Sequence, residues 1–378
     1  MTAKMIEEAV AKHFKTAVGL SRDLAAHPEI SHQEFESSRK IAAILEEAGF
    51  AVEYPFQGYP TAFRATRANG EGRAAAFLVE YDALPGIGHA CGHNLHGALS
   101  VLAGLAMMEL RNEFRGTISL VGTPGEEQAG AKIGMAAAGV FDGLSLAAMM
   151  HCVGGGSCQS NMAALGFRQF DLFFAGRAAH AVAAPWEGAS ALACARKFID
   201  LVDARRECFT QDIHFNAVFK DGGAAPNIIP ATASLRFDIR ADSDEKLDVM
   251  ERLARKCIDG AALAMDCTAR LVQAGGEYAA MKRLPEWEEK AARALRERGF
   301  KVAPVSPPLG STDMGNVSRR CPAIQPLLAV TDKPIPWHTP EFAAACLTPE
   351  AEDAMRRGAE VLVEIAIDAL DSPVKIIF

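Results

Sequence analysis

Residues 80–96 decide the fold, and they read Glu80-Tyr81-Asp82-Ala83-Leu84-Pro85-Gly86-Ile87-Gly88-His89-Ala90-Cys91-Gly92-His93-Asn94-Leu95-His96. An apolar run that is typical of a buried strand precedes them at 74–79, and leucines at helical spacing follow in 97–110. The stretch is therefore predicted to connect a strand to a helix, which is where open α/β sheets bind ligands. A polar loop can hold one structural histidine, but imidazoles, a thiol and carboxylates together favour a metal site.

The size and charge of the chain limit its architecture and its partners. A chain of 378 residues exceeds the usual limit for one hydrophobic core, so two domains are expected. The formal net charge of −8 argues against a nucleic-acid surface or an anionic membrane surface, because both need clustered lysine and arginine. We therefore expect a small-molecule partner.

The nine cysteines indicate the redox compartment. They are scattered from Cys91 to Cys346 without the paired spacing of a disulfide framework, which is typical of reduced thiols. The first helical pattern begins near Met1 with charged residues interleaved, so neither a signal peptide nor a membrane span is predicted. A cytoplasmic protein is the expectation.

The N-terminal segment is predicted to be helical. Two helical patterns lie in 5–48 and are interrupted at Pro28, because a proline disfavours helical conformation in the residue before it. Ser31 is expected to cap the second helix, and His27 and His32 are given structural roles.

Two further strands are predicted to end in polar residues. The run 116–122 precedes Glu126 and Glu127, and the apolar run 144–150 precedes His151. Together with the strand at 74–79, three consecutive strands each lead to candidate ligands, with helical segments between them. This order predicts an α/β catalytic domain with a mostly parallel sheet and one shared site at the carboxyl ends of its strands.

A second domain is predicted to interrupt the first. Residues 166–276 show strand, helix, strand, strand, helix and strand patterns in that order, which is typical of a ferredoxin-like α+β fold. The α/β pattern then resumes with a helix at 284–298, a strand near 323–330 and a final helix at 349–370. The catalytic domain is thus assigned to 1–165 and 277–378, and the inserted domain to 166–276.

Five residues in the predicted loops form a mixed ligand set: Cys91, His93, Glu127, His151 and His338. They exceed the three or four protein ligands of one catalytic zinc, and a thiolate or carboxylate can bridge, so two metal ions about 3.5–4 Å apart are predicted. The set suits zinc or manganese and accepts cobalt or nickel, so the sequence leaves the metal open. Glu126 is not needed as a ligand and is free to act as the base that deprotonates a metal-activated water.

Other uses of these residues are excluded or stay open. Zinc-finger and thermolysin-type sites are excluded, because the chain has neither a Cys-x-x-Cys pair nor a His-Glu-x-x-His motif. A cysteine nucleophile at Cys91 with His93 as its base is the main rival, but it leaves the other three ligand candidates without a role. A binding protein without activity would be expected to lack the base.

Several motifs belong together: Leu24-Ala25-Ala26-His27-Pro28-Glu29, Asp82-Ala83-Leu84-Pro85, His89-Ala90-Cys91-Gly92-His93, Glu126-Glu127, Gly176-Arg177-Ala178-Ala179-His180-Ala181 and His338. With them the chain resembles, over essentially its whole length, the dinuclear metallopeptidase and amidohydrolase family that includes carboxypeptidase G, aminoacylases and the indole-acetyl-amino-acid hydrolases. Residues 88–94 and 310–315 look like the branch of this family that cleaves aminobenzoyl-glutamate and related dipeptide-like amides.

The resemblance implies a role for each candidate residue. The five ligand candidates would bind two divalent metal ions per subunit, with Glu126 as the base and Asp82 orienting a ligand. The inserted domain would be a lid and dimerisation domain, in which His180 stabilises the oxyanion, usually in the neighbouring subunit's site. Asn227 and Arg240 would hold a substrate carboxylate. A homodimer or higher homo-oligomer is implied.

The expected activity follows from these residues and from the resemblance. We expect a metal-dependent amidohydrolase that cleaves the amide bond of an N-acyl amino acid or a dipeptide-like substrate. An N-carbamoyl amino acid hydrolase is the alternative, because the same attack by water works on a ureido carbon. The sequence departs from the family at Glu80, where many relatives carry a metal-binding histidine.

Overall fold

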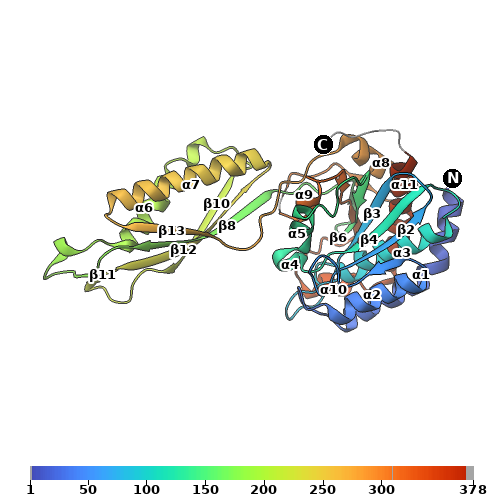
Figure 1. The fold of residues 1–378 in the computed structure, drawn as a ribbon, viewed down its shortest axis with the longest axis horizontal. Helices are drawn as coiled ribbons and strands as arrows, with labels where there is room; N and C mark the ends of the chain where they lie inside the picture. Colours follow the sequence, from blue (N-terminus) through green and yellow to red (C-terminus); the bar gives the residue numbers. More distant parts are fainter. Residues whose placement is uncertain (1, 309, 372–378) are drawn as a thin grey trace. The chain divides into compact units, whose positions relative to one another are not determined.

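The computed structural model describes residues 2–308 and 310–371, and the chain divides into two compact units (Figure 1). Unit 1 consists of Met1–Ala163, Lys282–Pro308 and Thr312–Phe378, and unit 2 consists of Ala164–Met281 and Leu309–Ser311. Unit 1 has a mixed, mainly parallel sheet with helices, and unit 2 has a separate antiparallel sheet. The predicted fold class is therefore confirmed, whereas the lid and dimerisation role of the inserted part stays a prediction.

The main sheet of unit 1 has six strands in the order β1-β2-β4-β3-β5-β15. They are β1 (Ala51–Glu53), β2 (Phe63–Asn69), β4 (Gly116–Gly122), β3 (Ala74–Val79), β5 (Leu146–Ala148) and β15 (Ala323–Ile324). The four strands from β4 to β15 are parallel, and β1 and β2 continue the sheet in antiparallel pairing. β3 is an uninterrupted apolar run because it is buried at the centre of this sheet.

Long helices pack against this sheet and against one another. α3 (His93–Glu109) contacts α1 (Ala3–Ala26), α11 (Pro349–Asp371) and β3, and it is buried from His93 to Met108 because its sequence is apolar on every side. The other helices of unit 1 are α2 (Phe35–Glu47), α4 (Glu126–Ala129), α5 (Ala131–Ala137), α8 (Pro285–Glu297), α9 (Met314–Val317) and α10 (Pro340–Ala345). The buried position of α3 holds its first residues, two of them candidate ligands or their neighbours, inside the unit.

Two apolar runs each supply strands to two sheets. Single strands were predicted at 144–150 and 323–330, but in each run the chain passes from the main sheet into a second one. β5 pairs with β15, and then β6 (His151–Gly154) pairs in parallel with β16 (Leu327–Thr331). The second sheet has the order β14-β7-β16-β6, with β14 at Val302–Ala303 and β7 at Cys158–Gln159. His151 therefore begins a strand of the second sheet.

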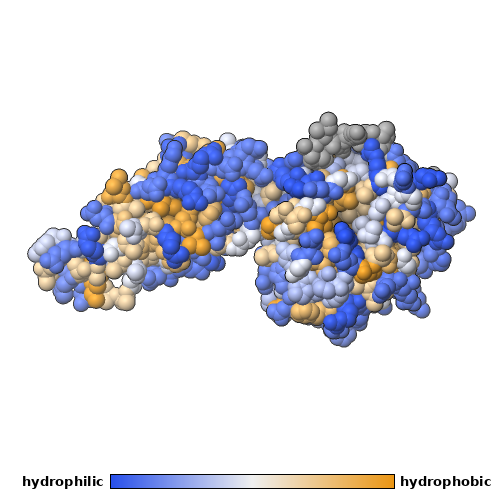
Figure 2. All heavy atoms as spheres, viewed as in Figure 1, coloured by the Kyte–Doolittle hydropathy of each residue, from blue (hydrophilic) through white to orange (hydrophobic). Residues whose placement is uncertain are grey.

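Unit 2 has a four-stranded antiparallel sheet in the order β10-β12-β8-β13, against which α6 and α7 pack. Its elements are β8 (Gly166–Ala175), β9 (Ala179–His180), η1 (Pro185–Glu187), α6 (Ala191–Asp203), η2 (Arg206–Cys208), β10 (His214–Asp221), β11 (Ile228–Ile229), β12 (Thr232–Ala241), α7 (Asp244–Ala264) and β13 (Thr268–Gln273). Alternate residues of β12 are buried, as its sequence predicts, and the strand order is ferredoxin-like. Apolar atoms also reach the surface of this unit (Figure 2), and Phe173 and Val218 are among its exposed side chains.

One local prediction is wrong. Ser31 does not cap α2, because the residue at the cap position is Glu34, and the Ser31 hydroxyl instead donates to Asp82 Oδ2 at 2.8 Å. A distant buried carboxylate therefore competes successfully for this hydroxyl. Among the described helices, none combines the length and the apolar character that a membrane span requires.

Candidate metal centre

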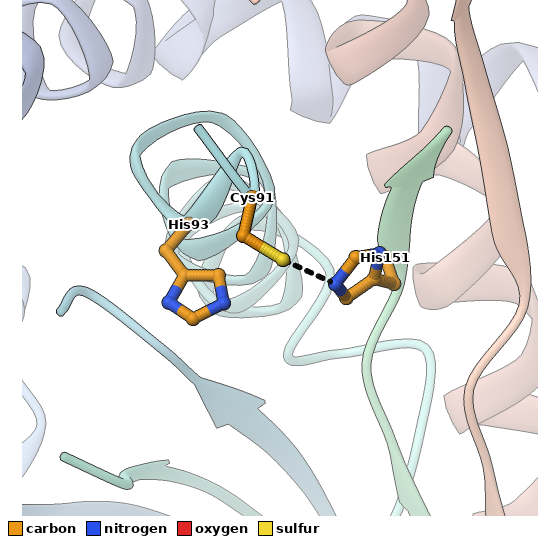
Figure 3. A group of neighbouring side chains, drawn as sticks. All are labelled: Cys91, His93 and His151. Carbon is orange, nitrogen blue, oxygen red and sulfur yellow. Dashed lines mark hydrogen bonds between the residues drawn. The ribbon is translucent and has the colours of Figure 1, made fainter. Parts of the chain in front are cut away.

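The five predicted ligands converge within unit 1. Cys91 lies directly before α3, His93 is the first residue of α3, Glu127 belongs to α4, His151 begins β6 and His338 precedes α10. Donor atoms of Cys91, His93 and His151 lie within 4.8 Å of one another (Figure 3), and so do those of Cys91, Glu127 and His338. Cys91 belongs to both groups, as expected of a thiolate that bridges two metal ions.

His93 and Glu127 each present one unpaired buried atom. His93 Nδ1 lies 2.9 Å from Asp82 Oδ1, while its Nε2 atom has no hydrogen-bond partner among the described residues. Glu127 Oε1 is equally unpaired there and lies 3.7 Å from that Nε2 atom. Buried polar atoms without partners cost free energy, so this pair fits a metal ion that would join them.

Asp82 connects two of the candidate ligands. Its Oδ1 atom faces His93, and its Oδ2 atom accepts the backbone N–H of Glu127 at 3.1 Å. Burial raises the pKa of Asp82, but the His93 ring outweighs this and holds the pKa below its ordinary value. Burial likewise lowers the pKa of His93, and Asp82 outweighs it and raises that pKa well above its ordinary value. In the metal-free chain a metal ion must therefore displace a proton from His93.

His151 and Cys91 face one another. His151 Nδ1 donates to the Cys152 carbonyl at 2.9 Å, and its Nε2 atom lies 3.3 Å from Cys91 Sγ. Burial lowers the pKa of His151 to about 3, so the ring is neutral and offers the Nε2 lone pair. Burial raises the pKa of the Cys91 thiol well above its ordinary value, and Glu127 adds to this effect. Without a cation Cys91 is not an activated nucleophile, which argues against the cysteine-hydrolase alternative.

Unusual backbone conformations position Cys91 and His338. Gly92 has a φ of 85°, and a Cβ atom there would lie 2.9 Å from Cys152 Cβ, so a glycine is required between Cys91 and His93. His338 has a φ of 61°, and its N–H group donates to the Ala90 carbonyl at 2.9 Å. Its Nε2 atom lies 3.4 Å from Glu127 Oε2, and its side chain is 56% exposed. His338 therefore borders solvent, whereas the other ligand candidates are buried or nearly so.

Glu80 and His96 also lie beside His93, but hydrogen bonds occupy them. His96 Nε2 lies 3.0 Å from Glu80 Oε2, and His96 Nδ1 accepts the backbone N–H of Cys152 at 3.3 Å. The other oxygen of Glu80 accepts from Lys132 Nζ at 2.6 Å. Both nitrogens of His96 and both oxygens of Glu80 are thus engaged, and neither side chain fits as a metal ligand.

Glu126 lies next to the candidate ligands without belonging to either group that contains Cys91. Its side chain is 15% exposed, and Oε2 lies 4.0 Å from His93 Nε2. Burial, followed by the nearby carboxylates of Glu80 and Asp313, raises the pKa of Glu126 well above its ordinary value. A carboxyl group in these surroundings can accept and hold a proton, which is the property of a general base.

Two residues that the sequence does not mark for function hold the segment around Glu126. Glu34 Oε1 accepts the backbone N–H of Gly125 at 2.9 Å, directly before Glu126. His32 Nε2 lies 3.0 Å from the carbonyl oxygen of Ala129, at the end of α4. Both residues lie shortly after the His27-Pro28 motif, and this position is the one sequence signal that could have indicated them.

His180 and Asn227 are neighbours within unit 2. β9 and β11 pair so that His180 lies opposite Ile228, and the Asn227 carbonyl accepts the N–H of Ala181 at 2.9 Å. The exposed His180 ring accepts the backbone N–H groups of Val182 and Ala183 at its Nδ1 atom, at 3.2 and 3.1 Å. The neutral ring must then carry its proton on Nε2, which makes this atom a donor.

Arg240 lies in a different part of unit 2, near the end of β12. Its guanidinium carbon lies 4.5 Å from the centre of the Phe167 ring, and Nη1 is 3.4 Å from Ser311 Oγ. Its Nε atom is 3.5 Å from Asp238 Oδ1, and a third of its side chain is exposed. Stacking on Phe167 orders the guanidinium plane and leaves donors for an anion.

Comparisons with known proteins agree with this centre. Residues 76–368 match the model of peptidase family M20/M25/M40. The Xaa-Arg dipeptidase of Homo sapiens is 33% identical over 94% of this chain and 85% of its own length. One of the two p-aminobenzoyl-glutamate hydrolase polypeptides of Escherichia coli (strain K12) is 30% identical over 70% of this chain and 59% of its own length.

Solved structures show the same fold. A dinuclear metal binding peptidase of the M20 family from Bacillus subtilis covers 96% of this chain and 99% of its own, with a TM-score of 0.78 and 22% identity. The aminobenzoyl-glutamate utilization protein of Klebsiella pneumoniae covers 98% of this chain and 100% of its own, with a TM-score of 0.73 and 22% identity. The family resemblance found in the sequence is confirmed: the chain belongs to peptidase family M20/M25/M40, whose members are metal-dependent hydrolases of amide and peptide bonds.

Proposed function

We propose that this chain hydrolyses the amide bond of a dipeptide or an N-acyl amino acid that bears a free carboxylate. Two divalent metal ions would be held by the five candidate ligands: Cys91, His93, Glu127, His151 and His338. The observation that carries the proposal is the pair of unpaired buried atoms, His93 Nε2 and Glu127 Oε1, 3.7 Å apart. Asp82 keeps the other ring nitrogen of His93 engaged, which leaves Nε2 for a metal.

Glu126 would be the general base of the reaction. When bound, the metal ions supply Lewis-acid activation of the attacking water and of the amide carbonyl. Glu126 takes the proton that the water loses and delivers it to the leaving amine. The raised pKa of this carboxyl, caused first by burial, supports the second half of this role, because the proton has to be held between the two steps. His180 would donate from Nε2 to the oxyanion, in the neighbouring subunit of a dimer.

Arg240 and Asn227 would bind the substrate carboxylate. A guanidinium group can donate two parallel hydrogen bonds to a carboxylate, and stacking on Phe167 orients it for this purpose. The names of the relatives suggest which substrates to try: Xaa-Arg dipeptides and p-aminobenzoyl-glutamate. Zinc and manganese are the metals to load first, followed by cobalt and nickel.

The proposal is tested with metal-loaded protein and a substrate panel. The panel contains Xaa-Arg dipeptides, p-aminobenzoyl-glutamate, N-acyl amino acids and N-carbamoyl amino acids. We expect hydrolysis of an amide next to a carboxylate, loss of activity on chelation and recovery with a divalent metal. Turnover of the carbamoyl compounds alone would favour the ureido alternative, and full activity of metal-free protein that is lost on alkylation of Cys91 would establish a cysteine nucleophile.

Substitutions separate the base from its neighbouring ligand. Glu126→Gln should keep its metal content and substrate binding and lower kcat by at least about 10²-fold, the lower end of a general-base contribution. Glu127→Gln is the matched variant one position away, and it should lose metal. Loss of metal from Glu126→Gln with retention in Glu127→Gln would mean that the two roles are exchanged.

A further inference from the structure

A fully buried ammonium lies beside the proposed centre. Lys132 is in α5, its side chain has no exposed area, and its Nζ atom lies 2.6 Å from Glu80 Oε1 and 2.7 Å from Asp313 Oδ1. The two carboxylates come from distant parts of the chain, the end of β3 and the start of α9. Lysine is almost never buried completely unless it is paired, so this position needs an explanation beyond packing.

The ammonium lies among three carboxylates. Oxygen atoms of Glu80, Glu126 and Asp313 lie within 4.8 Å of one another, close enough to share one cation. Carboxylates this close repel one another in a buried place, and a cation offsets the repulsion. Burial lowers the pKa of Lys132, but Asp313 and Glu80 outweigh this and raise it above its ordinary value, so the side chain stays charged.

The same ammonium holds the segment that carries Glu126. Asp313 packs against Gly130, the residue between α4 and α5, and a Cβ atom at Gly130 would come within 1.9 Å of Asp313 Oδ2. Lys132 follows two residues later and binds the other oxygen of Asp313. The segment after Glu126 is therefore anchored to α9 by a close backbone contact and by an ion pair.

We propose that Lys132 is a positioning residue whose ammonium takes the place of a further divalent cation among Glu80, Glu126 and Asp313. By filling this place it keeps Glu126 out of metal coordination and available for proton transfer. The second half of the proposal rests on the proposed role of Glu126 as the base. The first half concerns metal binding alone and can be tested whether or not Glu126 is the base.

The decisive variant is Lys132→Met, which keeps the length of the side chain and removes its charge. Wild-type and variant chains are loaded with zinc or manganese, freed of excess metal by gel filtration and analysed for metal per chain. We expect about two ions in the wild type and about one more in the variant, because three carboxylates then offer oxygen ligands without a cation. We also expect kcat to fall at least about 10²-fold with little change in KM, because the base is bound by metal.

Two further variants provide the controls. Arg298→Met removes another buried cation of unit 1, one that lies 3.6 Å from Glu360, and should leave the metal content and kcat unchanged. Lys132→Met combined with Asp313→Asn removes one carboxylate together with the ammonium, and its metal content should return to about two ions. The comparison separates a specific effect at the centre from the general cost of losing a buried charge.

Every outcome decides the proposal. A third ion in Lys132→Met supports it, and a fall in kcat without a third ion overturns it. If the variant folds only when metal is present, with a Tm that rises more on metal addition than that of the wild type, an ion has replaced the ammonium. If it fails to fold with metal as well, no divalent ion fits there and the proposal is wrong. A third ion with unchanged kcat would instead refute the role of Glu126 and leave the first half standing.

Discussion

Replacement of Asp82 by asparagine should weaken metal binding by reversing the proton on His93. Asp82 Oδ2 accepts from two donors, the Ser31 hydroxyl and the Glu127 N–H group, at 2.8 and 3.1 Å. An asparagine keeps these bonds only if its oxygen takes the Oδ2 position and its NH₂ group faces His93. The Nδ1 atom of His93 then has to accept, so the neutral ring carries its proton on Nε2, the atom that must face the metal.

The size of this effect follows from the role of Asp82 as partner of a ligating histidine. Loss of such a partner typically costs 10–100-fold in metal affinity. Since a tenfold change corresponds to about 1.4 kcal/mol, the expected loss of binding free energy is about 1.4–2.8 kcal/mol. The upper end is favoured here, because Asp82 and His93 are 1% and 0% exposed and solvent cannot replace the lost partner.

Competition with a chromophoric chelator measures the affinity for zinc or manganese. Ser31→Ala is the matched control, because it removes one hydrogen bond from Asp82 and leaves the contact with His93 intact. Asp82→Asn should lose 10–100-fold in affinity and the control much less. Wild-type affinity in Asp82→Asn would refute the tautomer argument, and an equal loss in both variants would assign the effect to general disturbance of the centre.

Three other predictions address the remaining parts of the chain. Arg240→Lys should raise KM at least about tenfold for substrates with a carboxylate and spare substrates without one, because lysine cannot donate two parallel bonds; an equal effect on both classes would place the anchor elsewhere. Inactive His180→Ala and inactive Glu126→Gln chains, once mixed and shown to exchange subunits, should regain part of the activity if His180 acts across a dimer, and a mixture that stays inactive contradicts this. Arg283 and Asn161 hold the pKa of Glu288 below its ordinary value despite burial, so this carboxylate stabilises the fold above pH 4.5 and loses its effect as the pH falls through the lower folded-state pKa. Denaturation of Glu288→Gln should accordingly show a deficit of about 1–2 kcal/mol at pH 7 that narrows below pH 4.5, and a deficit that does not depend on pH would exclude a charge effect.

The elements around the centre could be predicted because their signals are local. Residues 74–79 and 116–122 are short apolar runs with polar residues behind them, and they form β3 and β4. Ligand chemistry is equally local, since few residue types bind metal ions, and a cysteine two positions from a histidine already indicates them. Parallel strands then bring the ends of these runs to one edge of the sheet.

The rest could not be predicted, because it depends on contacts between distant residues. Nothing in the apolar runs 144–150 and 323–330 marks where the chain changes sheets, since the place is set by the pairing of the two runs with each other. Lys132 lies in a short helix whose pattern gives it no distinction, and its partners, Glu80 and Asp313, are 52 and 181 positions away. Ser31 is similar, because the carboxylate that binds its hydroxyl is 51 positions away.

The roles of the carboxylates in this centre follow from their donors rather than from their spacing in the chain. Asp82 has three donors, and Glu80 has an ammonium and an imidazole, so neither carboxylate is free to bind metal. Glu127 keeps an unpaired oxygen, and only this carboxylate among the three is set up as a ligand. A change that removes a donor should therefore redistribute the metal, whereas a change that removes a carboxylate abolishes one role without testing the others. Ser31→Ala leaves Asp82 with two donors and should free no ligand, while Lys132→Met deprives Glu80 of its charged donor and should create one.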